Sequence, residues 1–237
     1  MVRKKAKKGG FFGVSLGVGE PMNITVMALR VLNGVQVIAV PQAKKGERSV
    51  ALERMRNMPV HLEDKKVVEL YMPMKRDNLE THWQEAAATI KGYLSKGLDV
   101  AFAGIGDLLH YGTFHYLERL VKQEGFETLY VPGITSYQSL ASSINIPLVQ
   151  GNEKMAVLPD DDVDIDTLLK FDTIVFLKKP SNTQIFEALS KGYTLFLGKN
   201  LGLKGEVFGL IEDVKKDLAK LPYFSLVIAK KGHSDVQ

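Results

Sequence analysis

Residues 98–113 constrain the fold of this chain more than any other stretch. They begin with a short apolar run, pass through Gly104 and Gly106 to the acid Asp107, and lead into a helical pattern at 114–123. α/β proteins place a small ligand at the carboxyl end of a parallel sheet with such a strand, glycine-rich turn and helix, because glycine lets a ligand approach the backbone closely. Asp107 allows two interpretations: it either caps the helix or meets a hydroxyl, an amine or a cation.

The same alternation of apolar runs and helical patterns extends through the first half of the chain. Strands are predicted at 11–18, 35–40, 66–71, 100–102 and 128–131, and helices at 25–33, 49–57, 79–94, 114–123 and 136–144. Alternating strands and helices predict a parallel sheet that is covered by helices.

After Pro147 the pattern changes. One helical pattern of fair length, at 182–191, is surrounded by strand-like runs at 155–158, 173–177, 194–197, 207–211 and 224–229. The sequence therefore predicts an α/β fold of two domains, with a mainly parallel sheet in the first and a mixed sheet with helices in the second. We expect a basic flexible tail at 1–10, an N-terminal domain at 11–134 and a C-terminal domain at 135–237.

The composition fits a protein of the cytoplasm. The 237 residues suffice for one large domain or two small ones, and a hydrophobic content of 45% with 24% charged residues is ordinary for a globular protein. No apolar run approaches the roughly 18 to 20 residues of a membrane span, and the basic start leads into a strand-like segment instead of the apolar core of a signal peptide. The absence of cysteine excludes disulfides and thiolate metal sites.

The formal net charge of +4 is concentrated at the start of the chain, and the remainder is close to neutral. The basic residues of the first eight positions are Arg3, Lys4, Lys5, Lys7 and Lys8. Such an end is more often solvated than bound to nucleic acid, and a near-neutral body is not typical of a nucleic-acid-binding surface. We therefore expect no nucleic-acid partner, and a nucleic-acid-binding module remains an alternative that depends on the basic start alone.

Three strand-end loops, taken in order, resemble those of the tetrapyrrole methylase family. They are Gly17-Val18-Gly19-Glu20-Pro21, the stretch from Gly104 to Thr113, and Pro132-Gly133-Ile134-Thr135-Ser136. The likeness covers nearly the whole chain and includes Asn145–Leu148 and Leu221–Leu226. Members of this family methylate corrinoid and sirohaem precursors, and a few unrelated targets, with S-adenosylmethionine.

The resemblance implies a specific reaction and site. The most similar branch of the family methylates carbon 20 of precorrin-2 or cobalt-factor II in cobalamin synthesis. This implies a tetrapyrrole substrate, which either carries cobalt or does not. It also implies a homodimer whose active-site cleft lies between the two domains. The implied cofactor contacts are Pro21, Gly104, Ile105, Gly106, Asp107, His110, Thr135, Ser136 and Leu177. Candidate substrate contacts are Glu20, Arg48, Arg54 and Tyr111.

No catalytic acid, base or protein-bound metal is required by this interpretation. A meso carbon of a reduced tetrapyrrole is an enamine-like nucleophile, so positioning carries most of the catalysis. Asp107 would anchor the cofactor as a structural acid, and Glu20 could steer the proton that is lost after transfer. His110 and His115 are five residues apart, which does not fit a zinc pair on one helix face.

The sequence departs from the family pattern at two points. The first loop is about two residues shorter than the family's Gly-x-Gly-Pro-Gly-Asp-Pro and lacks its acid, and Leu108 replaces the proline that follows Asp107 in the family. These departures keep two alternatives open: a family member with another target, such as another corrin carbon, a modified histidine of a translation factor or ribosomal RNA, and a cofactor-binding protein without turnover.

Overall fold

The computed structural model describes residues 8–73 and 78–232. The chain forms two compact units, which meet in the sequence between Thr135 and Ser136. Within the described residues, no helix combines the length and apolar character needed to cross a membrane.

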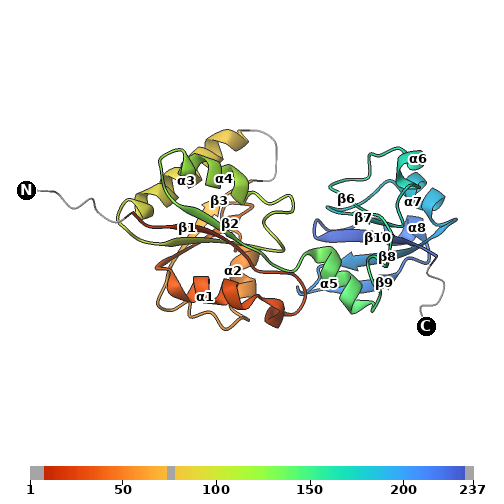
Figure 1. Cartoon of the computed structure of the whole chain (residues 1–237), viewed down its shortest axis with the longest axis horizontal. Helices are drawn as coiled ribbons and strands as arrows, with labels where there is room; N and C mark the ends of the chain where they lie inside the picture. Colours follow the sequence, from red (N-terminus) through yellow and green to blue (C-terminus); the bar gives the residue numbers. More distant parts are fainter. Residues whose placement is uncertain (1–7, 74–77, 233–237) are drawn as a thin grey trace, which may run out of the picture. The chain divides into compact units, whose positions relative to one another are not determined.

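The first unit contains a five-stranded sheet in which all strands are parallel, as the sequence predicts (Figure 1). The strand order is β3-β2-β4-β1-β5, with β1 at Phe11–Ser15, β2 at Val37–Gln42, β3 at Lys66–Tyr71, β4 at Val100–Gly104 and β5 at Thr128–Val131. Because helices cover both faces, the central strands are continuously apolar instead of alternating.

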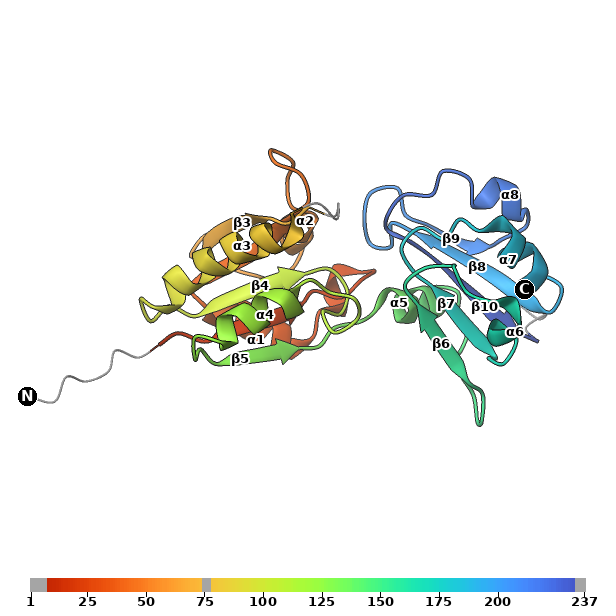
Figure 2. The same ribbon diagram turned by 90° about the horizontal axis from the view of Figure 1, so that it is seen from above.

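Within residues 8–73 and 78–135, two helices cover each face of this sheet. They are α1 (Val26–Gly34) and α2 (Val50–Met55) on one face, and α3 (Leu79–Leu94) and α4 (Phe114–Lys122) on the other (Figures 1 and 2). Strand β4 divides its side chains between the two cores: Phe102 packs with the α3 and α4 residues, and Ala101 packs with the α1 and α2 residues.

Neighbouring strands β1 and β4 send the chain to opposite faces of the sheet. The helix that follows β1 is α1, and the helix that follows β4 is α4. A sheet of this kind opens a crevice between the carboxyl ends of two such strands, and ligands bind there. The topology therefore points to the loops after β1 and β4 as the candidate site.

The chain before β1 differs from the expected flexible tail. Arg3, Lys4, Lys5 and Lys7 lie outside the described residues, but Lys8 to Gly10 are held against the first unit. The Lys8 ammonium donates to the Glu124 carbonyl (3.0 Å), and the Gly10 amide donates to the Asp99 carboxylate (2.7 Å). Gly9 is buried because its backbone lies directly against Leu98, so close that a Cβ atom would not fit.

The second unit contains the mixed sheet that the sequence predicts. Its strand order is β6-β7-β10-β8-β9, with β6 at Met155–Leu158, β7 at Thr173–Phe176, β8 at Tyr193–Lys199, β9 at Val207–Leu210 and β10 at Ser225–Lys231. Only the β6–β7 pair is parallel among these neighbours.

In the described part of the second unit, four helices accompany the sheet. They are α5 (Ser136–Ser143), α6 (Ile165–Leu168), α7 (Thr183–Leu189) and α8 (Val214–Asp217). The four-residue helices α6 and α8 were not expected from the sequence, because they are too short to show a periodic pattern. Aspartates fix their starts: Asp164 accepts the Thr167 amide, and Asp213 accepts the Lys216 amide.

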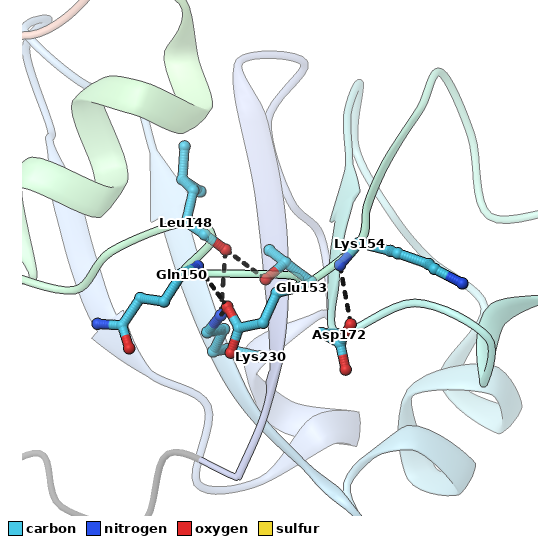
Figure 3. A network of polar contacts seen from close by, with 7 residues as sticks. Leu148, Gln150, Glu153, Lys154, Asp172 and Lys230 are labelled. Carbon is cyan, nitrogen blue, oxygen red and sulfur yellow. Dashed lines mark hydrogen bonds and ion pairs between the residues drawn. The ribbon is translucent and has the colours of Figure 1, made fainter.

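A buried lysine fixes the connection between α5 and β6 to the sheet (Figure 3). Lys230, on β10, is fully buried, and its ammonium donates to the Leu148 carbonyl (3.1 Å) and pairs with the Glu153 carboxylate. Thr173 donates to the same carbonyl, and Glu153 also accepts the Gln150 amide (2.7 Å). A buried ammonium requires such partners, since its desolvation is otherwise uncompensated.

Changing Glu153 to glutamine should reduce how strongly the stability of the second unit depends on pH in the acidic range. The hydrogen bond from Lys230, and then that from the Gln150 amide, lowers the pKa of Glu153. Its stabilising contribution is therefore present above the unfolded-state pKa of about 4.3 and is lost as the pH falls through the lower folded-state pKa.

Thermal unfolding followed by circular dichroism tests this prediction. At neutral pH the melting temperature of Glu153→Gln should lie several degrees below that of the wild type, and the two curves should converge in acid. Glu212→Gln, at an exposed glutamate of the same unit, is the matched control. A difference that does not change with pH would contradict the assignment.

Candidate active site

The carboxyl ends of β4, β1 and β5 lie next to one another in the sheet, and three loops leave from them. We call residues 16–20 the first loop, residues 105–113 the second loop and residues 132–135 the third loop. They contain most of the residues that the sequence proposes for the site.

The first and second loops are joined through two glycines. The amide of Gly17 donates to the Gly106 carbonyl and the amide of Gly106 donates to the Gly17 carbonyl, both at 3.1 Å. Gly17 has φ +68° and Gly106 has φ +77°, a conformation that favours glycine. At the base of the loops, the buried Ser15 hydroxyl accepts the Leu108 amide (3.0 Å).

Asp107 joins the second loop to the third. One carboxylate oxygen accepts the Leu109 amide (2.7 Å) and the other accepts the Gly133 amide (2.9 Å), and the side chain is 7% exposed. The ring nitrogen Nδ1 of His110 lies 3.6 Å from the same carboxylate. The structure therefore gives Asp107 a positioning role between two loops, which supports the expectation of a structural acid.

All three loops meet at Gly133. A Cβ atom at this position would lie 2.7 Å from the Cβ of Ser15, 2.9 Å from the Gly106 carbonyl oxygen and 3.1 Å from the Gly17 nitrogen. Only a glycine permits this approach. The sequence marks Gly133 as part of a motif, but the reason for the glycine is visible only in the folded chain.

Leu108, which replaces the proline of the family pattern, is accommodated without exposure. It is 5% exposed and packs against Gly104, where a Cβ atom would lie 2.6 Å from its side chain. Farther along the second loop, Tyr111 is 47% exposed and has φ +55°. A left-handed tyrosine is strained, and such strain is concentrated at functional sites.

The first loop continues into a short 3₁₀ helix, η1 (Pro21–Asn23), with Glu20 exposed just before it. Thr25 then caps α1 by accepting the Ala28 amide (3.1 Å), and its hydroxyl also donates to the Pro132 carbonyl (3.4 Å) of the third loop. The segment that carries Glu20 and Pro21 is thus connected to both other loops.

The environment of Arg54 does not fit the substrate contact that the sequence suggests for it. This α2 residue is 3% exposed, and its guanidinium donates to the carbonyls of Gly19 (2.8 Å), Glu20 (3.3 Å) and Leu16 (3.4 Å). A buried guanidinium that is occupied by the first loop is not placed to meet substrate carboxylates. Arg48 has an exposed side chain that pairs with Glu53 (3.6 Å), and within the described residues it has no hydrogen bond or ion pair with the three loops.

The remaining predicted residues have different environments. Ile105 is partly buried and packs against the core that contains α1 and α2, and Thr135 is buried at the end of the first unit. Ser136 and Leu177 belong to the second unit: Ser136 begins α5, and the amide of Leu177, directly after β7, donates to the Leu158 carbonyl (3.0 Å). Among the described residues, no group of three His, Asp or Glu side chains is placed to hold a metal ion.

One feature of the site was not found by sequence reasoning. It is Ser15, whose small polar side chain at a strand end was the only available signal. In the second unit, Lys178 and Lys179 after β7 are consecutive and both left-handed (φ +58° and +65°), which the sequence did not indicate. Lysine gives no sequence signal for that conformation, since glycine and asparagine are the residues that usually indicate it.

The strand order and the connected glycine loops define an α/β protein that binds a small ligand at the carboxyl edge of a parallel sheet. Residues 10–213 match the sequence model of the tetrapyrrole (corrin/porphyrin) methylases. The chain belongs to this family of methyltransferases, which take the methyl group from S-adenosylmethionine, and the predicted family, fold and class of enzyme are confirmed.

Individual proteins agree with this assignment. The chain is 34% identical over 227 residues to the Methanocaldococcus jannaschii protein named "Probable cobalt-precorrin-2 C(20)-methyltransferase", covering 93% of this chain and 95% of the relative. It is 28% identical to the cobalt-precorrin-2 C(20)-methyltransferase of Salmonella typhimurium, covering 94% and 97%. The solved structure of a cobalt-precorrin-4 methyltransferase has the same fold, with a TM-score of 0.74, 17% identity and coverage of 93% and 94%.

Substituting Gly133 by alanine should separate the three loops. We expect a loss of about 1–3 kcal/mol in unfolding free energy, as for other overpacked sites, and at least a tenfold loss of affinity for S-adenosylhomocysteine, about 1.4 kcal/mol. Calorimetric titration and chemical denaturation measure the two effects.

Gly92→Ala is the matched control for this substitution, because Gly92 lies within α3 and a Cβ atom there would have no neighbour within 4 Å. Its affinity should equal that of the wild type, and its stability should rise slightly. Unchanged affinity in Gly133→Ala would show that the contact of the loops does not matter for the ligand.

Proposed function

We propose that this chain is an S-adenosylmethionine-dependent methyltransferase that methylates carbon 20 of precorrin-2 or cobalt-factor II in cobalamin biosynthesis. The observation that carries the proposal is the similarity to the C(20)-methyltransferase of M. jannaschii over nearly the full length of both proteins. The connected loops of the first unit support it, because seven of the nine residues expected to contact the cofactor, all except Ser136 and Leu177, lie in these loops or directly beside them.

The residues present fit the proposed cofactor. Its amino acid end requires amide donors and an acceptor. The Gly106 amide already donates to Gly17, so we assign these contacts to the backbone of Ile105 and Asp107 on either side of it. The cofactor supplies an electrophilic methyl group on a sulfonium, which favours backbone carbonyl oxygens as neighbours. We assign Asp107 to hold the second loop in the binding geometry, and His110, Thr135, Ser136 and Leu177 to further contacts.

The contribution of the protein to the reaction is mainly positioning. The substrate carbon is itself nucleophilic, so a fixed geometry between the two reactants lowers the barrier without a strong base. We assign the exposed Glu20 to accept or guide the proton that the carbon loses, and Arg48 and Tyr111 to contact the tetrapyrrole. The presence of cobalt in the substrate, a homodimer and a cytoplasmic location stay predictions.

A cofactor-binding protein without turnover is the second candidate. The shortened first loop and Leu108 motivate it. The burial of Leu108 against Gly104 and the hydrogen bonds of Arg54 to the first loop count against it, because both departures are accommodated in an ordered site.

Titration with S-adenosylhomocysteine tests the cofactor site first. We expect one molecule bound per chain. We also expect at least a tenfold loss of affinity in Asp107→Asn, because the asparagine NH2 group would replace a carboxylate oxygen and two donors would then face each other. Asp64→Asn, at an exposed aspartate of the same unit, should bind like the wild type. Equal affinity in the two variants would remove Asp107 from the site.

Product analysis then tests the reaction. Incubated with precorrin-2 and with cobalt-factor II in parallel, the enzyme should add a single methyl group to one of them, and mass spectrometry with carbon-13 labelling should place it at carbon 20. Methylation of another carbon would select a different member of the family. Cofactor binding with no product from either substrate would favour the second candidate. Light scattering should give twice the mass of one chain if the homodimer is correct.

A further inference from the structure

Arg54 is a buried cation that the proposed reaction does not use directly. Its three guanidinium nitrogens each donate to a carbonyl of the first loop, those of Leu16, Gly19 and Glu20. Burial lowers the pKa of Arg54, and the nearby carboxylate of Glu20 acts in the opposite direction. A charge is buried in this way only when its partners are fixed, so Arg54 and the first loop hold each other in place.

The direction of these carbonyls sets the direction of the neighbouring amides. In a trans peptide the C=O and the following N–H point in opposite directions. The Leu16 carbonyl faces Arg54, and the next amide, that of Gly17, points away and donates to Gly106. By the same geometry the Gly19 carbonyl turns the Glu20 amide away from Arg54. That amide has no acceptor among residues 8–73 and 78–232.

We propose that Arg54 is a positioning residue that aims the Glu20 amide at a carboxylate oxygen of a bound ligand. The carboxylate belongs either to the amino acid end of the cofactor or to a side chain of the tetrapyrrole. The inference rests on the proposed function. In it, Arg54 does not contact the substrate itself but orients the Glu20 amide, which makes the contact with the ligand carboxylate.

Arginine suits this role better than lysine. Its planar fork presents several donors at fixed angles and stays charged at all relevant pH values, whereas a buried lysine readily loses its proton. The charged group of the first loop that faces Arg54 is Glu20, and on α2 itself Glu53 pairs with Arg48 and Arg56 on the exposed side. A lysine at position 54 should therefore hold the loop only while it is protonated.

The test compares Arg54→Met and Arg54→Lys with Arg30→Met, a matched change at an exposed arginine of α1. Hydrogen exchange of the amides at 17–20 is measured against wild type at the same pH, together with the affinity for S-adenosylhomocysteine and the KM for the tetrapyrrole. In Arg54→Met the loop amides should exchange faster, and at least one ligand should bind tenfold or more weakly, while β1 and β4 keep their protection.

The lysine variant makes the prediction specific. Arg54→Lys should resemble the wild type near about pH 6.5 and approach Arg54→Met near about pH 9, because the buried ammonium loses its proton as the pH rises. Wild type and Arg30→Met should show no such dependence relative to each other. If Arg54→Met does not fold, the pH dependence of Arg54→Lys provides the same test.

The outcomes separate the two ligand sources and the two proposals. Weaker S-adenosylhomocysteine binding assigns the carboxylate to the cofactor, and a higher KM at unchanged cofactor affinity assigns it to the tetrapyrrole. Unchanged binding of both ligands, or faster exchange throughout the sheet together with a lower melting temperature, overturns the positioning role. If the wild type binds no S-adenosylhomocysteine, the proposed function fails, and the exchange at 17–20 still decides whether Arg54 holds the loop.

Discussion

The hydrogen bond from the Gly133 amide to the Asp107 carboxylate is the interaction on which the site depends most. Parallel strands bring their carboxyl ends together, but they do not fix the loops that follow. A nearly buried carboxylate that accepts two amides fixes two of these loops, since charge-assisted hydrogen bonds are stronger than neutral ones. The close packing at Gly133 then leaves the first loop one place to lie, against Ser15 and Gly106.

The two departures from the family pattern are each matched by a local compensation. Leu108 replaces a rigid proline. Its side chain fills the space that the side chain of any residue larger than glycine at position 104 would need. The short first loop has few residues with which to form contacts of its own, and Arg54 supplies three hydrogen bonds from α2. The Leu108 side chain acts within its own loop, whereas Arg54 is 34 to 38 positions away in the sequence from the carbonyls that it supports.

The second unit is stabilised by a different principle. Its sheet is mixed, and the connection from α5 to β6 lies over β10 and is held by the buried Lys230. Paired and hydrogen-bonded, this lysine fixes the connection in one position, and removing one of its partners would leave an uncompensated charge. Conformational specificity here comes from a polar network, whereas in the first unit it comes from the close approach of glycine backbones.

The sequence by itself determined the order of the strands and the longer helices, the parallel and mixed sheets, the three loops and the family. The elements, sheets and loops follow from hydrophobic periodicity and from glycine, proline and capping residues, which act over a few positions. The family follows from the resemblance of the three loops. The tertiary structure decided what depends on partners far along the chain. Arg54 became a support of the first loop and not a substrate contact, Gly10 was bound by Asp99, and Asp107 was joined to Gly133. Burial and long-range hydrogen bonding gave these residues their roles, and neither can be read from a residue and its neighbours in the sequence.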